Sequence, residues 1–255
     1  MKILKEDTQS VGNILLETGA MLMSSGASTN RTRVTLERLA QGLGYGIELL
    51  ITQRALMLTI IEKEQQHFFS RLKRISPHGV NFRIVSGISH LSWNVMEQNW
   101  TVSQISEELH RLKSLPQYPR LVVLSLVGLA GSAFCHIFGG GNTEMSVAFV
   151  ATVIGLFVRQ EAMKQKFNPY LCVFFAAFAA SFIAGLAEHF HIGLQPDKAF
   201  ATSVLFLVPG VPLINSVTDL LDGNIQNGMV RAMSGLLIAF SIAIGLFAVK
   251  MILNL

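Results

Sequence analysis

Two hydrophobic patterns divide the chain near residue 119. Before that point, apolar residues recur at helical or alternating spacing among charged residues, which is typical of a folded, water-exposed domain. From Arg120 on, apolar residues run in long stretches that approach the ~20 residues a helix needs to cross a bilayer. We therefore predict an α+β domain over residues 1–119 and a membrane domain over residues 120–255.

Helices begin the predicted α+β domain. Apolar residues at three- and four-residue steps from Ile3 to Ser25 predict an amphipathic helix, which Gly26 is placed to end. Ser28 can cap a second helix that runs to about Leu43.

Short apolar runs follow, and they predict a small antiparallel sheet with a possible fourth strand, although a helix stays open for any one run. These runs are Ile47–Thr52, Ala55–Ile61, Gln65–Lys73 and, as the fourth, Val80–Ile84. Two more helices are expected, over about Ser86–Gln98 and from a capping box of Thr101 and Gln104 to Leu112. Leu115–Pro119 then forms the linker.

The second half predicts five membrane spans, at about 121–138, 143–158, 169–188, 199–221 and 229–253. Basic residues set their orientation, because cytoplasmic loops are enriched in Lys and Arg. Arg120 and the Arg159 to Lys166 segment lie on the predicted cytoplasmic side, while the Gly-rich loop after the first span has no basic residue. The expected protein is multi-pass, with its N-terminus in the cytoplasm and its C-terminus outside. Its fold class is an α-helical integral membrane protein with an N-terminal cytoplasmic α+β domain.

The fourth predicted span is interrupted, and this feature directs the functional interpretation. Pro209, Gly210 and Pro212 should kink or unwind the helix, because each proline removes a backbone donor and clashes with the preceding turn. We expect the helix to resume near Pro212. Three polar residues, Asn215, Asp219 and Asp222, then follow at helical spacing on one side.

Broken helices inside membranes often form substrate sites, because a half-helix N-terminus presents unpaired N–H groups to an anion. We therefore expect Pro209, Gly210, Pro212, Asn215 and Asp219 to bind substrate. Asp222, Glu161 and Arg231 are candidates for coupling or for lining the pathway. The alternative is a proline-kinked structural helix whose Asp219 and Asp222 lie at the cytoplasmic interface.

Composition supports a membrane protein and excludes other classes. Of the 255 residues, 51% are hydrophobic and 14% charged, and the mean hydropathy is +0.47. The net charge of +4 fits cytoplasmic loops better than a nucleic-acid partner. The two cysteines, Cys135 and Cys172, lie in apolar runs and support neither a disulfide nor a metal site. No catalytic constellation is recognisable, so we expect no enzyme and no cofactor.

Several segments resemble the threonine/serine exporter family, and more closely its split type. They are Ser25–Arg31, Tyr118–Arg120 and Val208–Asn215 with Asp219 and Gly223. The resemblance implies a subunit of a bacterial inner-membrane exporter of small carboxylates: threonine or serine, or a C4-dicarboxylate such as succinate. It also implies a separate small membrane subunit, because the second membrane module of full-length members is absent. Transporters built from inverted repeats need two halves that face each other across the substrate. This chain has an odd number of predicted spans and no second copy of the break, so the other half would come from another chain or from a second copy of this one.

A different hypothesis is a membrane-anchored regulatory or scaffold protein that acts through its cytoplasmic domain. It predicts that Pro209 and Gly210 tolerate alanine and that the domain functions when it is cut free. A membrane-tethered hydrolase is disfavoured, because the sequence shows no nucleophile and base pair.

Overall fold

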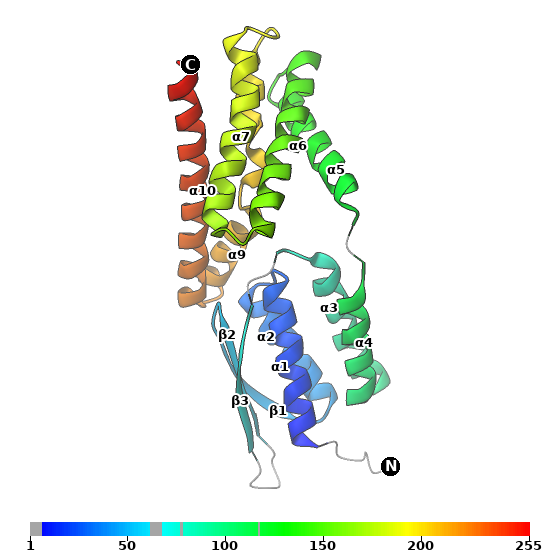
Figure 1. Ribbon diagram of the computed structural model, residues 1–255. Coiled ribbons are helices and arrows are strands. Elements are labelled where there is room, and N and C mark those ends of the chain that lie inside the picture. Colours follow the sequence, from blue (N-terminus) through cyan, green and yellow to red (C-terminus); the bar gives the residue numbers. More distant parts are fainter. Residues whose placement is uncertain (1–6, 62–67, 77–78, 117) are drawn as a thin grey trace. The chain divides into compact units, whose positions relative to one another are not determined.

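The computed structural model describes residues 7–61, 68–76, 79–116 and 118–255, which form two compact units (Figure 1). The first unit contains residues 1–116 together with 211–232, and the second contains residues 117–210 together with 233–255. The predicted division at residue 119 stays a prediction. The two compact units differ from that division in one respect: residues 211–232 pack with the N-terminal part of the chain.

The first unit combines helices with a small sheet. Its N-terminal elements are α1 (Thr8–Ser24), α2 (Thr29–Gly42), β1 (Gly46–Ile51), β2 (Ala55–Ile61), β3 (Phe68–Arg74), α3 (Phe82–Gln98) and α4 (Val102–Ser114). The three strands are antiparallel in the order β1-β2-β3, as the sequence predicts. Most of α9 (Gly210–Leu221) and the first turns of α10 (Ile225–Leu253) complete the unit.

Alternation along β2 explains how the sheet joins the core. Leu56, Leu58 and Ile60 are fully buried on one face, where α1 packs against β2 and β3. Gly19 of α1 allows this close approach, since a Cβ there would lie 2.4 Å from a methyl carbon of Leu56. Helix α2 packs against β1, and α3 covers α2.

The predicted fourth strand, Val80–Ile84, is wrong. Asn81 is instead the N-cap of α3, and its side chain accepts hydrogen bonds from the backbone N–H groups of Arg83 and Ile84. The cap satisfies donors that a helix start leaves free, so the apolar residues after Asn81 continue as a helix.

Three other predicted helix boundaries are confirmed, whereas the predicted start of the first helix at Ile3 lies outside the described residues and α3 begins at Phe82 rather than near Ser86. Ser28 caps α2 by accepting from Arg31 N, and Gly26 ends the first helix region with a φ of 89°. Such a backbone angle favours glycine. Thr101 and Gln104 form the expected reciprocal capping box at the start of α4.

All regular secondary-structure elements among the described residues of the second unit are helices. This unit contains α5 (Arg120–Ile137), α6 (Asn142–Lys164), α7 (Pro169–His189), α8 (Pro196–Thr202), the 3-10 turn η1 (Leu205–Leu207) and most of α10. Among the residues described, α5, α6, α7 and α10 are long and apolar enough to cross a membrane. The segment of α8 and η1 with α9 makes a fifth span if an interrupted helix pair counts as one. Two helices exceed their predicted spans: α6 continues to Lys164, and α10 begins at Ile225.

Small residues let the helices of the second unit pack closely. A Cβ at Gly155 of α6 would lie 2.9 Å from the carbonyl oxygen of Ala176 in α7. Gly245 of α10 similarly faces Ala177, whose Cβ would be 2.8 Å away. Ala176, Ala180 and Ala184 are fully buried at four-residue steps along α7, so this stripe of small residues is a packing surface.

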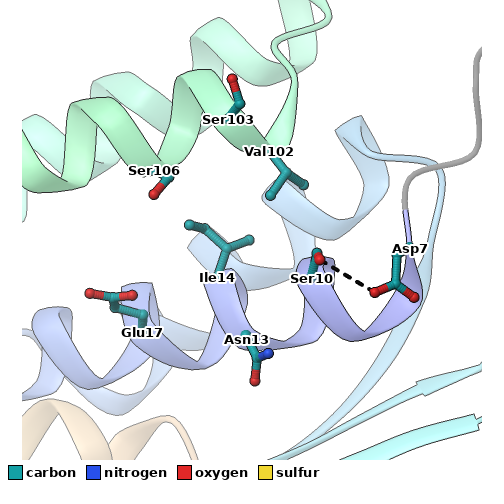
Figure 2. Close-up of a pocket in the computed structure, with 8 residues that line it drawn as sticks. All are labelled: Asp7, Ser10, Asn13, Ile14, Glu17, Val102, Ser103 and Ser106. Carbon is teal, nitrogen blue, oxygen red and sulfur yellow. Dashed lines mark hydrogen bonds between the residues drawn. The ribbon is translucent and has the colours of Figure 1, made fainter.

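A shallow groove lies between α1 and α4 in the first unit, with a volume of about 530 Å³ (Figure 2). It is lined by Asp7, Ser10, Asn13, Ile14, Glu17, Val102, Ser103 and Ser106. Near one end, Lys113 of α4 pairs with Glu17 of α1. The hydrogen bond from Lys113 holds the pKa of the Glu17 carboxyl below its ordinary value. This pair connects the first and last helices of the N-terminal segment.

We expect Lys113→Met to lower the stability of the full chain in detergent at pH 7 by less than about 1 kcal/mol, because the pair is partly exposed. A carboxyl group whose pKa is lowered on folding stabilises the folded state at pH values above its pKa in the unfolded chain. This stabilisation is lost as the pH falls through the pKa that the group has in the folded state. The difference between wild type and variant should therefore shrink in thermal unfolding measured at progressively lower pH. In a Glu17→Gln background the same substitution should show no such pH dependence; a pH-independent difference in the wild-type background would contradict the assignment.

Candidate functional site

The predicted interruption of the fourth span is present. The 3-10 turn η1 ends at Leu207, and Val208 leaves helical geometry with φ −57° and ψ 111°. The helix resumes as α9 at Gly210, two residues before the predicted start. Pro212 fits within the first turn, where the hydrogen bond that its ring nitrogen lacks would not form in any case.

Helices α9 and α10 form a tight hairpin. Gly223, with φ 79°, turns the chain between them, and Asn224 N donates to the carbonyl oxygen of Asp219 at 2.7 Å. Ser216 Oγ donates to the carbonyl oxygen of Gly228 at 2.8 Å. A Cβ at Gly228 would lie 3.0 Å from the backbone nitrogen of Leu220, so the approach of the two helices requires glycine there.

Asp219 occupies the centre of the hairpin's polar face, and its side chain is fully buried. Its Oδ1 accepts from the backbone N–H of Thr29 at 2.9 Å, and its Oδ2 accepts from the Thr29 hydroxyl at 3.0 Å. Thr29 is the first residue of α2, whose N-terminal N–H groups carry positive partial charge. The carboxylate is therefore bound at a helix N-terminus 190 residues away in sequence.

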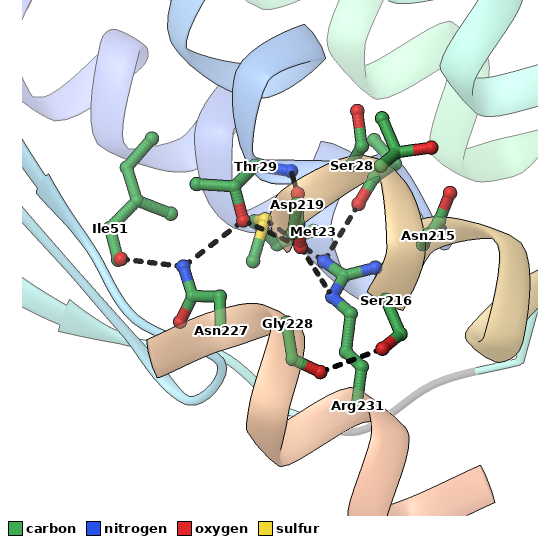
Figure 3. A network of polar contacts seen from close by, with 12 residues as sticks. Met23, Ser28, Thr29, Ile51, Asn215, Ser216, Asp219, Asn227, Gly228 and Arg231 are labelled. Carbon is green, nitrogen blue, oxygen red and sulfur yellow. Dashed lines mark hydrogen bonds and ion pairs between the residues drawn. The ribbon is translucent and has the colours of Figure 1, made fainter. Parts of the chain in front are cut away.

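Arg231, on the second turn of α10, supplies the compensating charge. Its Nε lies 3.0 Å from Oδ2 of Asp219, an ion pair in which the N–H is not aligned for a hydrogen bond. Its Nη2 donates to the carbonyl oxygen of Ala27 at 3.0 Å. Both members of the pair are buried, with side-chain exposures of 6% for Arg231 and 0% for Asp219. Figure 3 shows these side chains converging between the hairpin and the start of α2.

Amide side chains extend the network in both directions. Asn227 Nδ2 donates to the Thr29 hydroxyl at 3.0 Å and to the carbonyl oxygen of Ile51 at 2.8 Å, which connects α10 to the end of β1. Asn215 Nδ2 donates to the carbonyl oxygen of Gly26 at 2.8 Å. The hairpin is thus joined to the turn before α2, to α2 itself and to the sheet.

The structure brings together some predicted site residues and separates others. Asn215, Asp219 and Arg231 join one network, whereas Asp222 follows the end of α9 and is exposed. Glu161 belongs to the second unit, where it pairs with Arg120 at 2.5 Å and Lys164 at 3.1 Å. Pro209 and Gly210 lie at the interruption and in the second unit.

The sequence analysis did not predict Thr29 or Asn227 as site residues. Thr29 donates to Asp219, and Asn227 donates to the hydroxyl of Thr29. The available signal was the segment Ser25–Arg31, which the family resemblance singled out without indicating what it contacts. The structure shows that Gly26, Ala27 and Thr29 of this segment bind Asn215, Arg231 and Asp219 respectively.

The arrangement can bind a carboxylate in the interior of the protein. A buried ion pair needs further hydrogen bonds to offset the cost of removing both charges from water, and here two hydrogen bonds from Thr29 supplement the guanidinium. Within the described ranges, no group of three or more His, Cys, Asp and Glu side chains is placed to hold a metal ion. The donors present are those that bind carboxylate groups.

Comparison with known proteins gives a family match over nearly the whole chain. The ThrE family model, described as a threonine/serine exporter, matches residues 13–253. A relative in Klebsiella aerogenes, named probable succinate transporter subunit YjjP, is 28% identical over 247 residues, which cover 96% of this chain and 95% of the relative. The protein of the same name in Escherichia coli K12 is 28% identical over 242 residues, covering 94% and 93%.

A longer relative matches with only part of its length. The threonine/serine exporter of Corynebacterium glutamicum is 25% identical over 245 residues, which cover 92% of this chain but 50% of the relative. No solved structure matches the chain.

We expect Thr29→Val to lower stability by about 1–3 kcal/mol, because it removes a hydroxyl that bonds buried Asp219 and Asn227 while keeping the side-chain shape. Thr32→Val is the matched control. Thr32 is also buried on α2, but its hydroxyl donates only to the carbonyl oxygen of Ser28 in its own helix. Thermal unfolding of the two purified variants should separate them, and equal losses would show that the Thr29 hydroxyl has no special role.

Proposed function

Because the chain belongs to the threonine/serine exporter family, we propose that it is one subunit of an exporter of small carboxylate metabolites in the bacterial inner membrane. The substrate is threonine or serine, or a C4-dicarboxylate such as succinate. The name of the two relatives that match along almost their full length favours the dicarboxylate. Membership of this family supports a role in transport rather than in catalysis.

The observation that supports this proposal most strongly is the meeting of two separate signature segments. The family resemblance covers Ser25–Arg31 and the segment Val208–Asn215 with Asp219, and these segments contact each other through Asn215 and Asp219. A structural anchor has no need of a buried carboxylate and guanidinium just after a broken helix. A transporter of anions does need a buried guanidinium, because it must compensate the substrate's negative charge inside the protein.

A second subunit completes the exporter. The Corynebacterium glutamicum relative, which is named an exporter, is about twice as long as this chain, because the match covers 92% of this chain but only 50% of that protein. The YjjP relatives, in contrast, have this chain's length and are named subunits. We assign the missing half to a separate small membrane subunit, with a homo-oligomer as the other arrangement.

Within this subunit, the interruption at Pro209, Gly210 and Pro212 receives the substrate with Asn215 and Asp219. Arg231, Asp222 and Glu161 serve the pathway or its coupling, and Asp219 takes part in proton or amine coupling. The N-terminus lies in the cytoplasm and the C-terminus outside, as the distribution of basic residues predicts.

The scaffold alternative requires that the cytoplasmic domain act by itself. Cutting the chain after Pro116 would remove residues 211–232 from the first unit and leave the carbonyl oxygens of Gly26, Ala27 and Ile51 without the partners they have in the full chain. This arrangement favours a domain that works together with the hairpin.

Export should depend on Asp219. We expect Asp219→Asn to lower efflux of succinate or threonine from preloaded proteoliposomes by about tenfold or more, because the amide leaves the buried guanidinium of Arg231 without a compensating charge. Glu97→Gln, an exposed change on α3, should export at the wild-type rate. The vesicles contain this chain with its candidate membrane subunit, and each alone serves as a further comparison. Unchanged efflux at unchanged protein content would remove Asp219 from the mechanism.

The interruption should matter for transport more than for folding. Pro209→Ala permits a continuous helix, so we expect export to fall severalfold while the protein is still recovered folded from the membrane. Pro116→Ala, in the linker before α5 and outside the segments that carry the family resemblance, is the matched proline change and should export normally. Normal export by Pro209→Ala, with activity in a detached cytoplasmic domain, would instead favour the scaffold.

A further inference from the structure

The carboxylate of Asp219 occupies a site built from other parts of the chain. The N–H and the hydroxyl of Thr29 come from α2, and the guanidinium of Arg231 comes from α10. Only the carboxylate itself comes from α9. A helix N-terminus, a hydroxyl and a guanidinium together form a receptor for one carboxylate, whichever molecule supplies it.

The receptor is held in place by contacts that do not involve Asp219. Nη2 of Arg231 donates to the carbonyl oxygen of Ala27 and lies 3.9 Å from the sulfur of Met23. Asn227 donates to the oxygen of the Thr29 hydroxyl, so the hydroxyl hydrogen is left to point at the carboxylate. The donors are therefore oriented in advance, as in preformed ligand sites.

Asp219 does not use the full capacity of this receptor. The Nε of Arg231 is buried and close to Oδ2, yet it makes no aligned hydrogen bond. A guanidinium can bind a carboxylate through two parallel N–H bonds, and a carboxylate on a free molecule can adopt that geometry more readily than one fixed to a helix. The buried Nε is thus a polar group directed at the site without a hydrogen-bond partner.

We propose that this receptor is the carboxylate-binding site for the substrate, and that Asp219 is an internal carboxylate which the substrate's carboxylate replaces. The inference rests on the proposed function. Exchange of one carboxylate for the other keeps the charge of Arg231 compensated throughout, so neither state contains an unpaired buried cation. It also removes the repulsion that Asp219 would exert on an anionic substrate, because Asp219 leaves the site when the substrate enters.

The site selects carboxylates over their neutral analogues. An amide of similar shape leaves Arg231 uncompensated and presents N–H groups to other donors, and such mismatches in buried polar sites are strongly disfavoured. Amino acids and dicarboxylates both satisfy the requirement, since each carries at least one carboxylate.

Chemical rescue tests the proposal. Asp219→Ala empties the receptor, and we expect sodium acetate at ~100 mM to raise the unfolding temperature of the purified full-length variant by roughly 3–5 °C. Neither acetamide, the neutral isostere of acetate, nor sodium chloride at equal ionic strength should raise the unfolding temperature of this variant. The double variant Asp219→Ala/Arg231→Gln should lose the acetate effect. Asp7→Ala is the matched control, because Asp7 also accepts a hydrogen bond at a helix N-terminus but is exposed.

Several results would overturn the proposal. They are an acetate effect no larger than that of chloride, an effect that persists without Arg231, and an equal effect in Asp7→Ala. If Asp219→Ala is recovered folded only when acetate is present during purification, and not with acetamide, the proposal is supported. Failure to fold under both conditions counts against it.

Export by the wild-type protein, measured in proteoliposomes alongside the rescue experiment, distinguishes failure of this inference from failure of the proposed function. Rescue by acetate with no export of any carboxylate by the wild type would contradict the proposed function alone. Export with no rescue would contradict the carboxylate exchange alone.

Discussion

Burial of the Asp219 carboxylate at the N-terminus of α2 is the interaction on which the first unit depends. A buried carboxylate is strongly unfavourable unless a cation and hydrogen-bond donors compensate it. Here Arg231 supplies the cation and Thr29 supplies both donors. The requirement explains neighbouring residues that would otherwise look unrelated. Gly26 turns the chain so that α2 begins at this point, and Gly228 lets α10 come close enough to α9 for Arg231 to reach the same carboxylate.

Helix α9 therefore has two faces with different roles. Its polar face contacts the N-terminal segment Ser25–Arg31 through Asn215 and Asp219, while Ile214, Val217 and Leu221 of its other face are 67%, 57% and 83% exposed. Such a short amphipathic helix differs from the spans of the second unit, where glycine and alanine let α6, α7 and α10 pack closely. The interruption at Val208 and Pro209 marks the change from one kind of packing to the other.

Local chemistry made much of the fold predictable. The end of the first helix at Gly26, the Ser28 cap, the Thr101 and Gln104 capping box and the interruption near Pro209 depend on residues within one turn of each other, and all are confirmed. The prediction of a fourth strand was wrong because a local contact that it did not consider forms there. A short apolar run is compatible with a strand or a helix, and the Asn81 side chain decided for the helix by binding the first free N–H groups of α3. The match to the exporter family confirms the resemblance drawn from the motifs.

By itself, the sequence determined that this is a membrane protein with a charge-rich N-terminal segment, a broken span and a set of polar residues following the break. These properties follow from hydrophobic run length, proline geometry and helical spacing, which act over a few turns. Only the tertiary structure decided that Asp219 lies against Thr29 and Arg231, and that Asp222 stays outside the network. Contacts between residues 190 positions apart depend on how the helices pack, and no local pattern carries that information.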